Sequence, residues 1–355
     1  MPTDKVLKRN STMDSRSRCV AAIRGEPVDR VPVFPLIMHA AQKRHGITYR
    51  QFAGDGSALA EAQLRFHDAF AVDAVTVCSD AFRITGDLGG TIVFPEQSPP
   101  YAAAPVVRNA ADLTHLRRPD PRRPGSRMAD RIASVEQLVR SIGSTCLACG
   151  WVDMPFAEAC SVCGVSEFMV LIHDDPPLAH HLLEFLTEIV KDFALAQVSV
   201  GAPLIGAGDS AASLISGSTY RAFALPYEQR VCAAVHEAGG MVKLHICGNT
   251  QHLLRDIAAS GADLMNVDHM VDLSAARDAY VPVGAAIKGN LDPVADLLQA
   301  APELCRERCL ECMKITGGSR YLLSPGCEVP AHTPDEVLHA FCSAPTVFAS
   351  QSRVA

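Results

Sequence analysis

Short apolar runs alternate with longer amphipathic stretches along most of this chain. The runs are rich in small and β-branched residues, which is typical of parallel strands that are buried on both faces. They lie at Val31–Phe34, Ala74–Val77, Cys146–Trp151, Pro203–Ile205, Val242–Leu244, Leu264–Val267, Val281–Ala286 and Tyr321–Leu323. The pattern therefore predicts eight buried strands.

The stretches between these runs carry helix signals. Pro177–Val198 is long and amphipathic, whereas Thr219–Ala238, Thr250–Ser260 and Pro293–Thr316 each end before glycine. Strand alternating with helix about eight times favours the α/β class and a single (β/α)8 TIM barrel, with a doubly wound parallel sheet as the alternative.

The domain organisation follows from the same pattern. Residues 1–18 are polar and charged, so we expect a flexible N-terminus there and one TIM-barrel catalytic domain over residues 19–350. The stretch Arg117–Arg127 is rich in proline and arginine, but the α/β pattern resumes on both sides of it. We predict a surface loop there rather than a domain boundary.

Composition excludes several classes of protein. The chain has 355 residues, of which 48% are hydrophobic, so it can bury a large core. The net charge of -7 disfavours a nucleic-acid binder, which needs a basic surface. No apolar run is long enough to span a membrane, and the N-terminus lacks the apolar segment of a secretory signal. The 13 cysteines, an odd number, then indicate reduced thiols and a cytoplasmic location.

Polar side chains follow most of the predicted strands. In a TIM barrel the carboxyl ends of the strands meet at one mouth, where active sites are built. We therefore expect a shared pocket for residues that are far apart in the sequence, namely Asp80, Asp209, His245, Cys247, Asn266, Asp268, Lys288, Asn290 and Cys327.

Three of these residues suit a metal. His245 and Cys247 lie two apart at the end of a strand, so their side chains point to the same face. Cys327 follows the last strand, which a closed barrel would bring towards them. One histidine and two cysteines with an open fourth position are typical of a catalytic zinc site. The alternative is a buried histidine with two unrelated core cysteines.

Other cysteines compete for the same interpretation. Cys146-x-x-Cys149 and Cys160-x-x-Cys163 have the spacing of a structural metal site. The first pair, however, lies on a predicted strand, where such positions face opposite ways, and the second lies in a helical pattern among Ala and Val. Core packing is the better interpretation of both pairs, and also of the helix face formed by Cys305, Cys309 and Cys312.

Asp209, Glu158 and Asn290 are polar candidates for the same site. Gly206–Ala211 formally fits a dinucleotide-binding glycine pattern, but no clean helix opens there, and we prefer a flexible loop at the mouth that presents Asp209. Glu158 lies among small apolar residues, where it would donate a proton, orient a ligand or complete a metal sphere, or simply sit at a helix N-terminus. Asn290 would bind substrate or cap the next helix.

The chain resembles the uroporphyrinogen decarboxylase superfamily, and within it the zinc-dependent corrinoid methyltransferases. This resemblance covers nearly the whole chain. It is carried by Asp29-Arg30-Val31-Pro32-Val33, Gly150–Gly164, Ile215-Ser216, Pro226-Tyr227, His245-Ile246-Cys247-Gly248-Asn249-Thr250, Gly289-Asn290-Leu291-Asp292-Pro293, Ser324-Pro325-Gly326-Cys327-Glu328-Val329-Pro330 and Thr333-Pro334.

The resemblance implies an activity and its cofactors. It places the family's Zn²⁺ ligands at His245, Cys247 and Cys327. The expected reaction moves a methyl group between cobalt and a thiol or a small O-, S- or N-methylated substrate. The sequence shows no corrinoid-binding D-x-H-x-x-G segment, so the corrinoid, as methylcobalamin, would be carried by a partner protein.

Further roles complete this interpretation. We expect Glu158 and Asp209 to tune or complete the site and Asn290 to help position the substrate. The expected substrate contacts are Asp80, His39 and Asn266. The sequence identifies neither the methyl donor nor the acceptor, and it leaves the oligomeric state open, with a homodimer as one candidate.

Two alternatives remain. The first is a porphyrinogen decarboxylase, because Asp80 resembles the catalytic aspartate of that family. However, the decarboxylases carry a segment with a substrate-binding arginine at a position where this chain has Phe34-Pro35-Leu36-Ile37-Met38-His39. The second is a barrel that binds a corrinoid or a thiol without catalysis.

Overall fold

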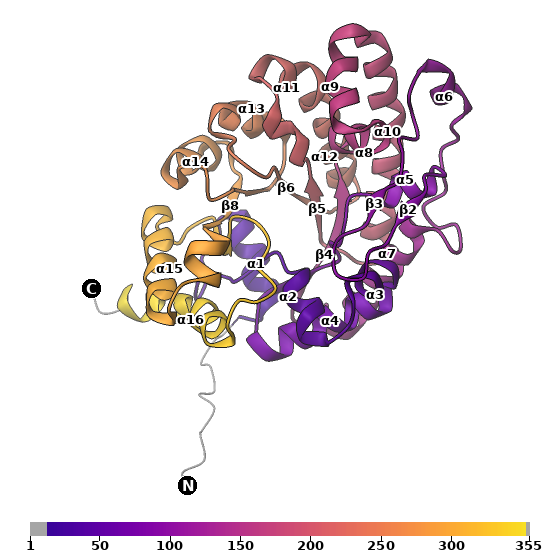
Figure 1. Cartoon of the computed structure of the whole chain (residues 1–355). Coiled ribbons are helices and arrows are strands. Elements are labelled where there is room, and N and C mark those ends of the chain that lie inside the picture. Colours follow the sequence, from indigo (N-terminus) through magenta and orange to yellow (C-terminus); the bar gives the residue numbers. More distant parts are fainter. Residues whose placement is uncertain (1–12, 353–355) are drawn as a thin grey trace.

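Seven parallel strands form the central sheet in the computed structural model, which describes residues 13–352 (Figure 1). In the order of both the chain and the sheet they are β1 (Ala74–Thr76), β4 (Leu147–Asp153), β5 (Leu204–Gly208), β6 (Met241–His245), β7 (Leu264–Asn266), β8 (Ala286–Leu291) and β9 (Tyr321–Pro325). The sheet is curled, and because its strands are all parallel, their carboxyl ends share one edge.

The first predicted strand does not form. Val33 makes only an isolated parallel bridge with Leu323, and its carbonyl accepts a hydrogen bond from the Asp73 amide at 2.8 Å. The segment thus contacts both edges of the sheet, but Pro32 and Pro35 have no amide hydrogen with which to extend a ladder. The predicted eight-stranded barrel is therefore observed as a curled sheet of seven strands.

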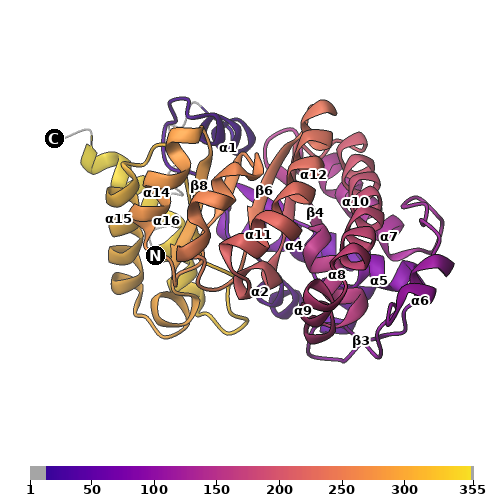
Figure 2. The same cartoon turned by 90° about the horizontal axis from the view of Figure 1, so that it is seen from above.

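Helices cover the outside of the curl (Figure 2). For example, α10 packs on β4 and α12, and α15 packs on α16. The longer helices are α1 (Ser15–Arg24), α4 (Gly56–Phe70), α7 (Arg127–Ile142), α8 (Pro155–Cys163), α9 (Val165–Asp174), α10 (Pro176–Ser199), α12 (Leu225–Glu237), α14 (Leu273–Tyr280), α15 (Pro302–Thr316) and α16 (Asp335–Ser352).

Shorter elements fill the connections. The short α-helices are α2 (His39–His45), α3 (Tyr49–Gly54), α5 (Arg83–Asp87), α6 (Ala110–His115), α11 (Gly217–Phe223) and α13 (Leu254–Ile257). The 3-10 helices are η1 (Ser210–Leu214), η2 (Gln251–Leu253), η3 (Ala258–Ser260) and η4 (Val281–Val283), and η5 (Pro293–Leu298) is a π-helix. An antiparallel hairpin joins β2 (Ile92–Val93) and β3 (Tyr101–Ala102).

Prolines explain where the predicted boundaries differ. The helix predicted over Thr219–Ala238 breaks between α11 and α12, where Pro226 occupies the first turn of the second helix. The strand predicted at Val281–Ala286 begins only at Ala286, because Pro282 lies in a 3-10 turn. Asn290 consequently lies within β8 rather than after it.

The chain is helical earlier than predicted. Of the predicted flexible segment, residues 1–12 lie outside the described residues, but α1 begins at Ser15. The Asp14 side chain caps it by accepting a hydrogen bond from the Ser17 amide at 2.7 Å. Arg18 is buried and forms ion pairs with Asp29 at 2.6 Å and with Asp73 at 2.8 Å.

Within the described part of the chain, no single helix combines the length and hydropathy needed to cross a membrane. The pair α8 and α9 meets that criterion together, with a bend of 107° between the two helices.

Candidate metal centre and adjoining pocket

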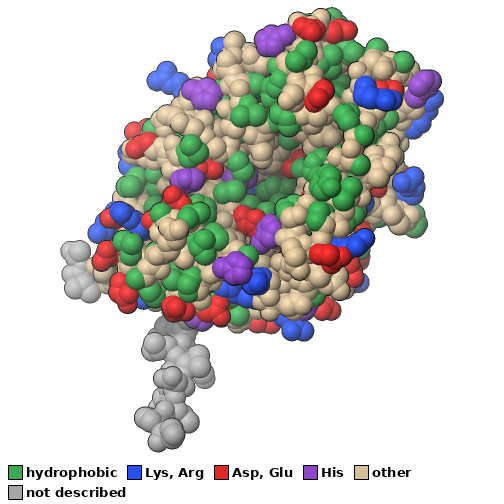
Figure 3. Space-filling model, in the orientation of Figure 1, with side chains coloured by type: hydrophobic (Ala, Val, Ile, Leu, Met, Phe, Trp, Pro, Cys, Tyr) green, Lys and Arg blue, Asp and Glu red, His purple; other side chains and the backbone are tan. Residues whose placement is uncertain are grey.

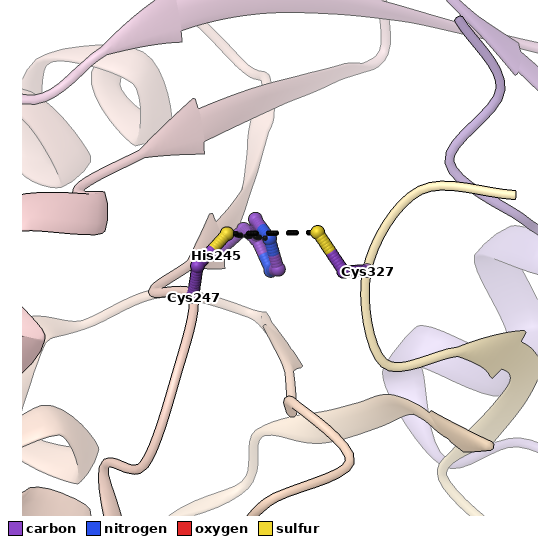
Figure 4. Close-up of side chains that lie close together, drawn as sticks. All are labelled: His245, Cys247 and Cys327. Atoms are coloured by element: carbon purple, nitrogen blue, oxygen red, sulfur yellow. Dashed lines mark hydrogen bonds between the residues drawn. The ribbon is translucent and has the colours of Figure 1, made fainter. Parts of the chain in front are cut away.

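Three potential ligands meet at the carboxyl edge of the sheet (Figure 4). His245 is the last residue of β6, Cys247 follows two residues later, and Cys327 follows the end of β9. The Cys247 sulfur lies 2.8 Å from Nε2 of His245 and 3.7 Å from the Cys327 sulfur. No other His, Cys, Asp or Glu among residues 13–352 joins this group.

The spacing of these atoms fits zinc. Two Zn–S bonds of about 2.3 Å at a tetrahedral angle hold the sulfurs about 3.7 Å apart, as Cys247 and Cys327 are here. The same geometry asks for about 3.5 Å between sulfur and nitrogen. His245 and Cys247 would therefore separate slightly around an ion. Three protein ligands leave the fourth position open, as in catalytic zinc sites.

Asn266 holds the two sides of this site together. Its backbone carbonyl lies 3.4 Å from Nδ1 of His245, which leaves Nε2 for a metal. Its side-chain amide donates to the carbonyl of Gly326, next to Cys327, at 3.2 Å, and its Oδ1 accepts from Lys288 at 2.6 Å. The Asn266 side chain is thus bonded at both ends and buried, rather than free to contact a substrate.

The pKa values of the two thiols are shifted in opposite directions. A hydrogen bond from the Cys247 thiol lowers the pKa of Cys327, against the effect of burial, and His245 lowers it further. The same hydrogen bond and burial raise the pKa of Cys247.

A pocket of about 630 Å³ lies near the metal ligands, although none of these three residues lines it. Ser210 belongs to its wall and also lies beside Cys247, where its hydroxyl lowers the pKa of that thiol. Another part of the wall is Asp153, at the end of β4. Most of the remaining lining is apolar, and Figure 3 shows hydrophobic side chains around a hollow on this face.

Asp153 is the residue that sequence reasoning missed. β4 continues two residues beyond the predicted strand, so Asp153 occupies the strand end at which polar side chains were expected. Burial raises its pKa to about 7, and Arg83, with Nη1 3.7 Å from its Oδ2, opposes that rise. Asp153 thus exchanges its proton near neutral pH.

Glu158 lies behind Asp153 on α8 and does not line the pocket. It is 2% exposed, and its Oε2 has no hydrogen-bond partner in the described structure. Burial, and then the charge of Asp153, raise its pKa. The structure therefore places Glu158 next to a pocket carboxyl group, and outside the set of metal ligands.

The sequence predicts a flexible loop that presents Asp209 at the mouth, and this prediction is wrong. The segment after it is the 3-10 helix η1, and the side chain is fully buried. Burial and the nearby Glu228 raise the pKa of Asp209, while Tyr220 donates a hydrogen bond to Glu228. Two facing carboxyl groups out of water must share a proton.

The other three predicted residues are also engaged in contacts within the protein. Asp80 binds Arg127 at 2.9 and 3.0 Å. The Asn290 amide donates to the backbone carbonyls of Asp268 and Val271. Nδ1 of His39 lies 3.0 Å from Oε1 of Glu328, the neighbour of Cys327.

Sequence comparisons place the chain among known proteins. The family model described as Uroporphyrinogen decarboxylase (URO-D) matches residues 14–346. The methylcobamide:CoM methyltransferase MtbA of Methanosarcina acetivorans is 29% identical over 325 residues, which are 90% of this chain and 94% of the relative. A uroporphyrinogen decarboxylase of Synechococcus sp. is 26% identical over 337 residues, or 91% of this chain and 95% of that protein.

A solved structure supports the fold. The methyltransferase from Methanosarcina mazei superposes with a TM-score of 0.86 at 22% sequence identity, over 95% of this chain and 99% of that one.

Proposed function

The chain belongs to the uroporphyrinogen decarboxylase family, and on that premise we propose that it is a zinc-dependent methyltransferase. It transfers a methyl group between a small methylated substrate, or a thiol, and the cobalt of a separate corrinoid protein. The convergence of His245, Cys247 and Cys327 carries this proposal. The similarity to a methylcobamide:CoM methyltransferase supports it.

The chain's own residues divide the work. His245, Cys247 and Cys327 would hold the ion, and Asn266 fixes both His245 and the backbone before Cys327. When bound there, zinc supplies Lewis acidity that stabilises a thiolate or the heteroatom of a leaving group. Asp153 lines the adjoining pocket and holds the proton that a departing heteroatom needs or that an incoming thiol gives up.

The remaining predicted residues act at a distance in this proposal. Glu158 lies behind Asp153, whose charge, after burial, raises the pKa of Glu158. Asp209 and Asn290 contact the backbone around the site. Asp80 and His39 anchor the surrounding segments through Arg127 and Glu328.

The site supports a methyltransferase better than a porphyrinogen decarboxylase. Asp80 is already bound by Arg127 and lies 3.8 Å from Arg83, so it is not free to meet a pyrrole. In addition, a decarboxylase has no use for a histidine and two cysteines arranged around an open coordination position.

The metal content of the purified protein tests the proposal. By elemental mass spectrometry we expect about one zinc per chain in the wild type and none in Cys327→Ser. Cys312→Ser, which changes a half-buried cysteine on α15, serves as the control and should keep the metal. Methyl transfer from a set of methyl donors to free cob(I)alamin is then followed by visible absorbance. A metal-free wild type contradicts the proposal, and zinc without transfer to any donor favours the non-catalytic barrel.

A further inference from the structure

Within residues 13–352, the lining of the pocket near the metal centre contains acidic residues but no basic ones. Its ionisable lining includes two carboxylic acids, the buried Asp153 and Glu167 near the solvent. Among the described residues that line it there is no Lys, Arg or His. Sites that bind sulfonates, carboxylates or phosphates usually offer the planar cation of arginine or the ammonium of lysine.

Two arginines close to Asp153 and Asp80 are already paired with carboxyl groups. Arg83 is fully buried, donates to the backbone of Asp80 and to the Ser79 hydroxyl, and faces Asp153. Both terminal nitrogens of Arg127 donate hydrogen bonds to Asp80. Neither guanidinium group is therefore free to balance the charge of a substrate anion.

Two lysines inside the curled sheet do not change this balance. Lys288 donates to Asn266, beneath the metal ligands. Lys243 is fully buried, with its Nζ 4.4 Å from the centre of the Trp151 ring. Neither of them lines the pocket, so neither offers a substrate anion a direct ion pair.

The rim of the pocket is apolar although it is exposed. Tyr101, Val165 and Leu214 line the pocket and are 51%, 47% and 68% exposed. They come from β3, α9 and η1, three segments that are far apart in the sequence. A cluster of exposed apolar side chains around a concave site indicates a ligand with an apolar body.

We propose that this pocket takes a methyl donor with an apolar body and no negative charge, and that it excludes anionic substrates. The inference rests on the function proposed above and narrows its substrate. Two kinds of methyl donor meet this description. One is an uncharged methyl ether or thioether, and the other is a methylated ammonium. An anion would lose part of its hydration in this pocket without gaining a counter-charge from the lining, which costs binding free energy.

Binding of three matched probes tests the proposal. Methoxybenzene, 4-methoxybenzylamine and 4-methoxybenzoate have the same ring and methyl group but are neutral, cationic and anionic. Each is titrated calorimetrically into the zinc-loaded protein without any corrinoid, so the result is independent of methyl transfer. We expect the neutral or the cationic probe to bind at least tenfold more tightly than the benzoate.

The outcomes separate the possible substrates. Tightest binding of methoxybenzene indicates an ether or thioether, and tightest binding of the benzylamine indicates a methylated amine. The proposal is overturned if the benzoate binds as well as either of the others, or if none of the three binds. A protein that shows the expected ranking but transfers no methyl group would contradict the proposed function, whereas the preference of the pocket for ligands without negative charge would stand.

A charge reversal provides the second test. Glu167→Lys places a cation on the lining, and we expect it to raise the affinity for the benzoate roughly fivefold while that for methoxybenzene stays unchanged. Glu307→Lys makes the same change at an exposed position of α15 and serves as the control. We expect it to leave the affinities for both probes unchanged. Equal benzoate affinities in the two variants would count against the proposal.

Discussion

Asp153 and His245 lie in register on either side of Gly208, at the ends of β4, β5 and β6. Two strand spacings place their backbones about 10 Å apart at the same level of the sheet. Because the residue between them has no side chain, the pocket acid and the metal ligand face a common space. In the proposed reaction, a small methylated group held between them would reach both Asp153 and an ion bound by His245.

Asp153→Asn should change the pH dependence of methyl transfer. Asp153 has a pKa raised to about 7, so in the demethylation direction it donates its proton below that pH, and the wild-type rate should fall as the pH rises through 7. The amide has no proton to give, so we expect a rate about a hundredfold lower and without this inflection. Initial rates between pH 5 and 9 check both points. An unaltered profile in the variant would rule out the role of Asp153.

The same substitution has a consequence for stability that separates folding from catalysis. A carboxyl group with a raised pKa stabilises the fold below its unfolded pKa, and that contribution is lost as the pH rises through about 7. The asparagine variant should therefore gain stability relative to the wild type between pH 5 and pH 8, by on the order of 2 kcal/mol. Urea denaturation at the two pH values measures this difference.

Asn266→Ala should weaken zinc binding. The substitution removes the hydrogen bond to Gly326 and leaves the amine of Lys288 without its acceptor, so the two sides of the site lose their link. Loss of such an outer contact lowers metal affinity about 10- to 100-fold, which competition with a chelator measures. Asn109→Ala removes the cap of α6 far from the site and should cost stability without changing zinc affinity. Equal zinc affinities in the two variants would refute the role of Asn266.

Gly208→Ala should disturb the pocket and spare the metal. A Cβ at this position would lie 2.7 Å from Oδ1 of Asp153 and 3.3 Å from the Trp151 ring, so the acid has to move. We expect weaker binding of methoxybenzene, by roughly tenfold, with an unchanged zinc content. In Gly54→Ala, where the nearest atom would be 3.9 Å away, neither quantity should change. Loss of zinc in Gly208→Ala would show instead that the glycine supports the ligands.

The alternation of side chains along a strand made it predictable that His245 and Cys247 lie together. His245 and Cys247 are two residues apart after an apolar run, so their common direction follows from backbone geometry alone. Asp153 also lies at the end of a strand, but it was not predicted as a site residue. The apolar run appeared to stop at Trp151, two residues before the strand ends. A strand end is set by its neighbours in the sheet, and no local pattern reports it.

Buried carboxyl groups were harder to assign. Asp80 and Asp209 both follow predicted strands, and the sequence gives no sign of what they face. Their neighbours come from distant helices: Arg127, 47 residues from Asp80, starts α7, and Glu228 lies on α12. Their environment is therefore a product of tertiary packing. The missing first strand, in contrast, could have been foreseen from its two prolines.

The separation of the ligands along the chain has a consequence for biosynthesis. Cys247 and Cys327 are 80 residues apart, and Cys327 enters the site only once β9 has paired with β8. During translation, the His245 and Cys247 pair therefore emerges from the ribosome well before its third partner exists. Coordination of an ion by all three residues would therefore have to wait until the last strand of the sheet has been synthesised and docked, which would make metal uptake a late event in maturation.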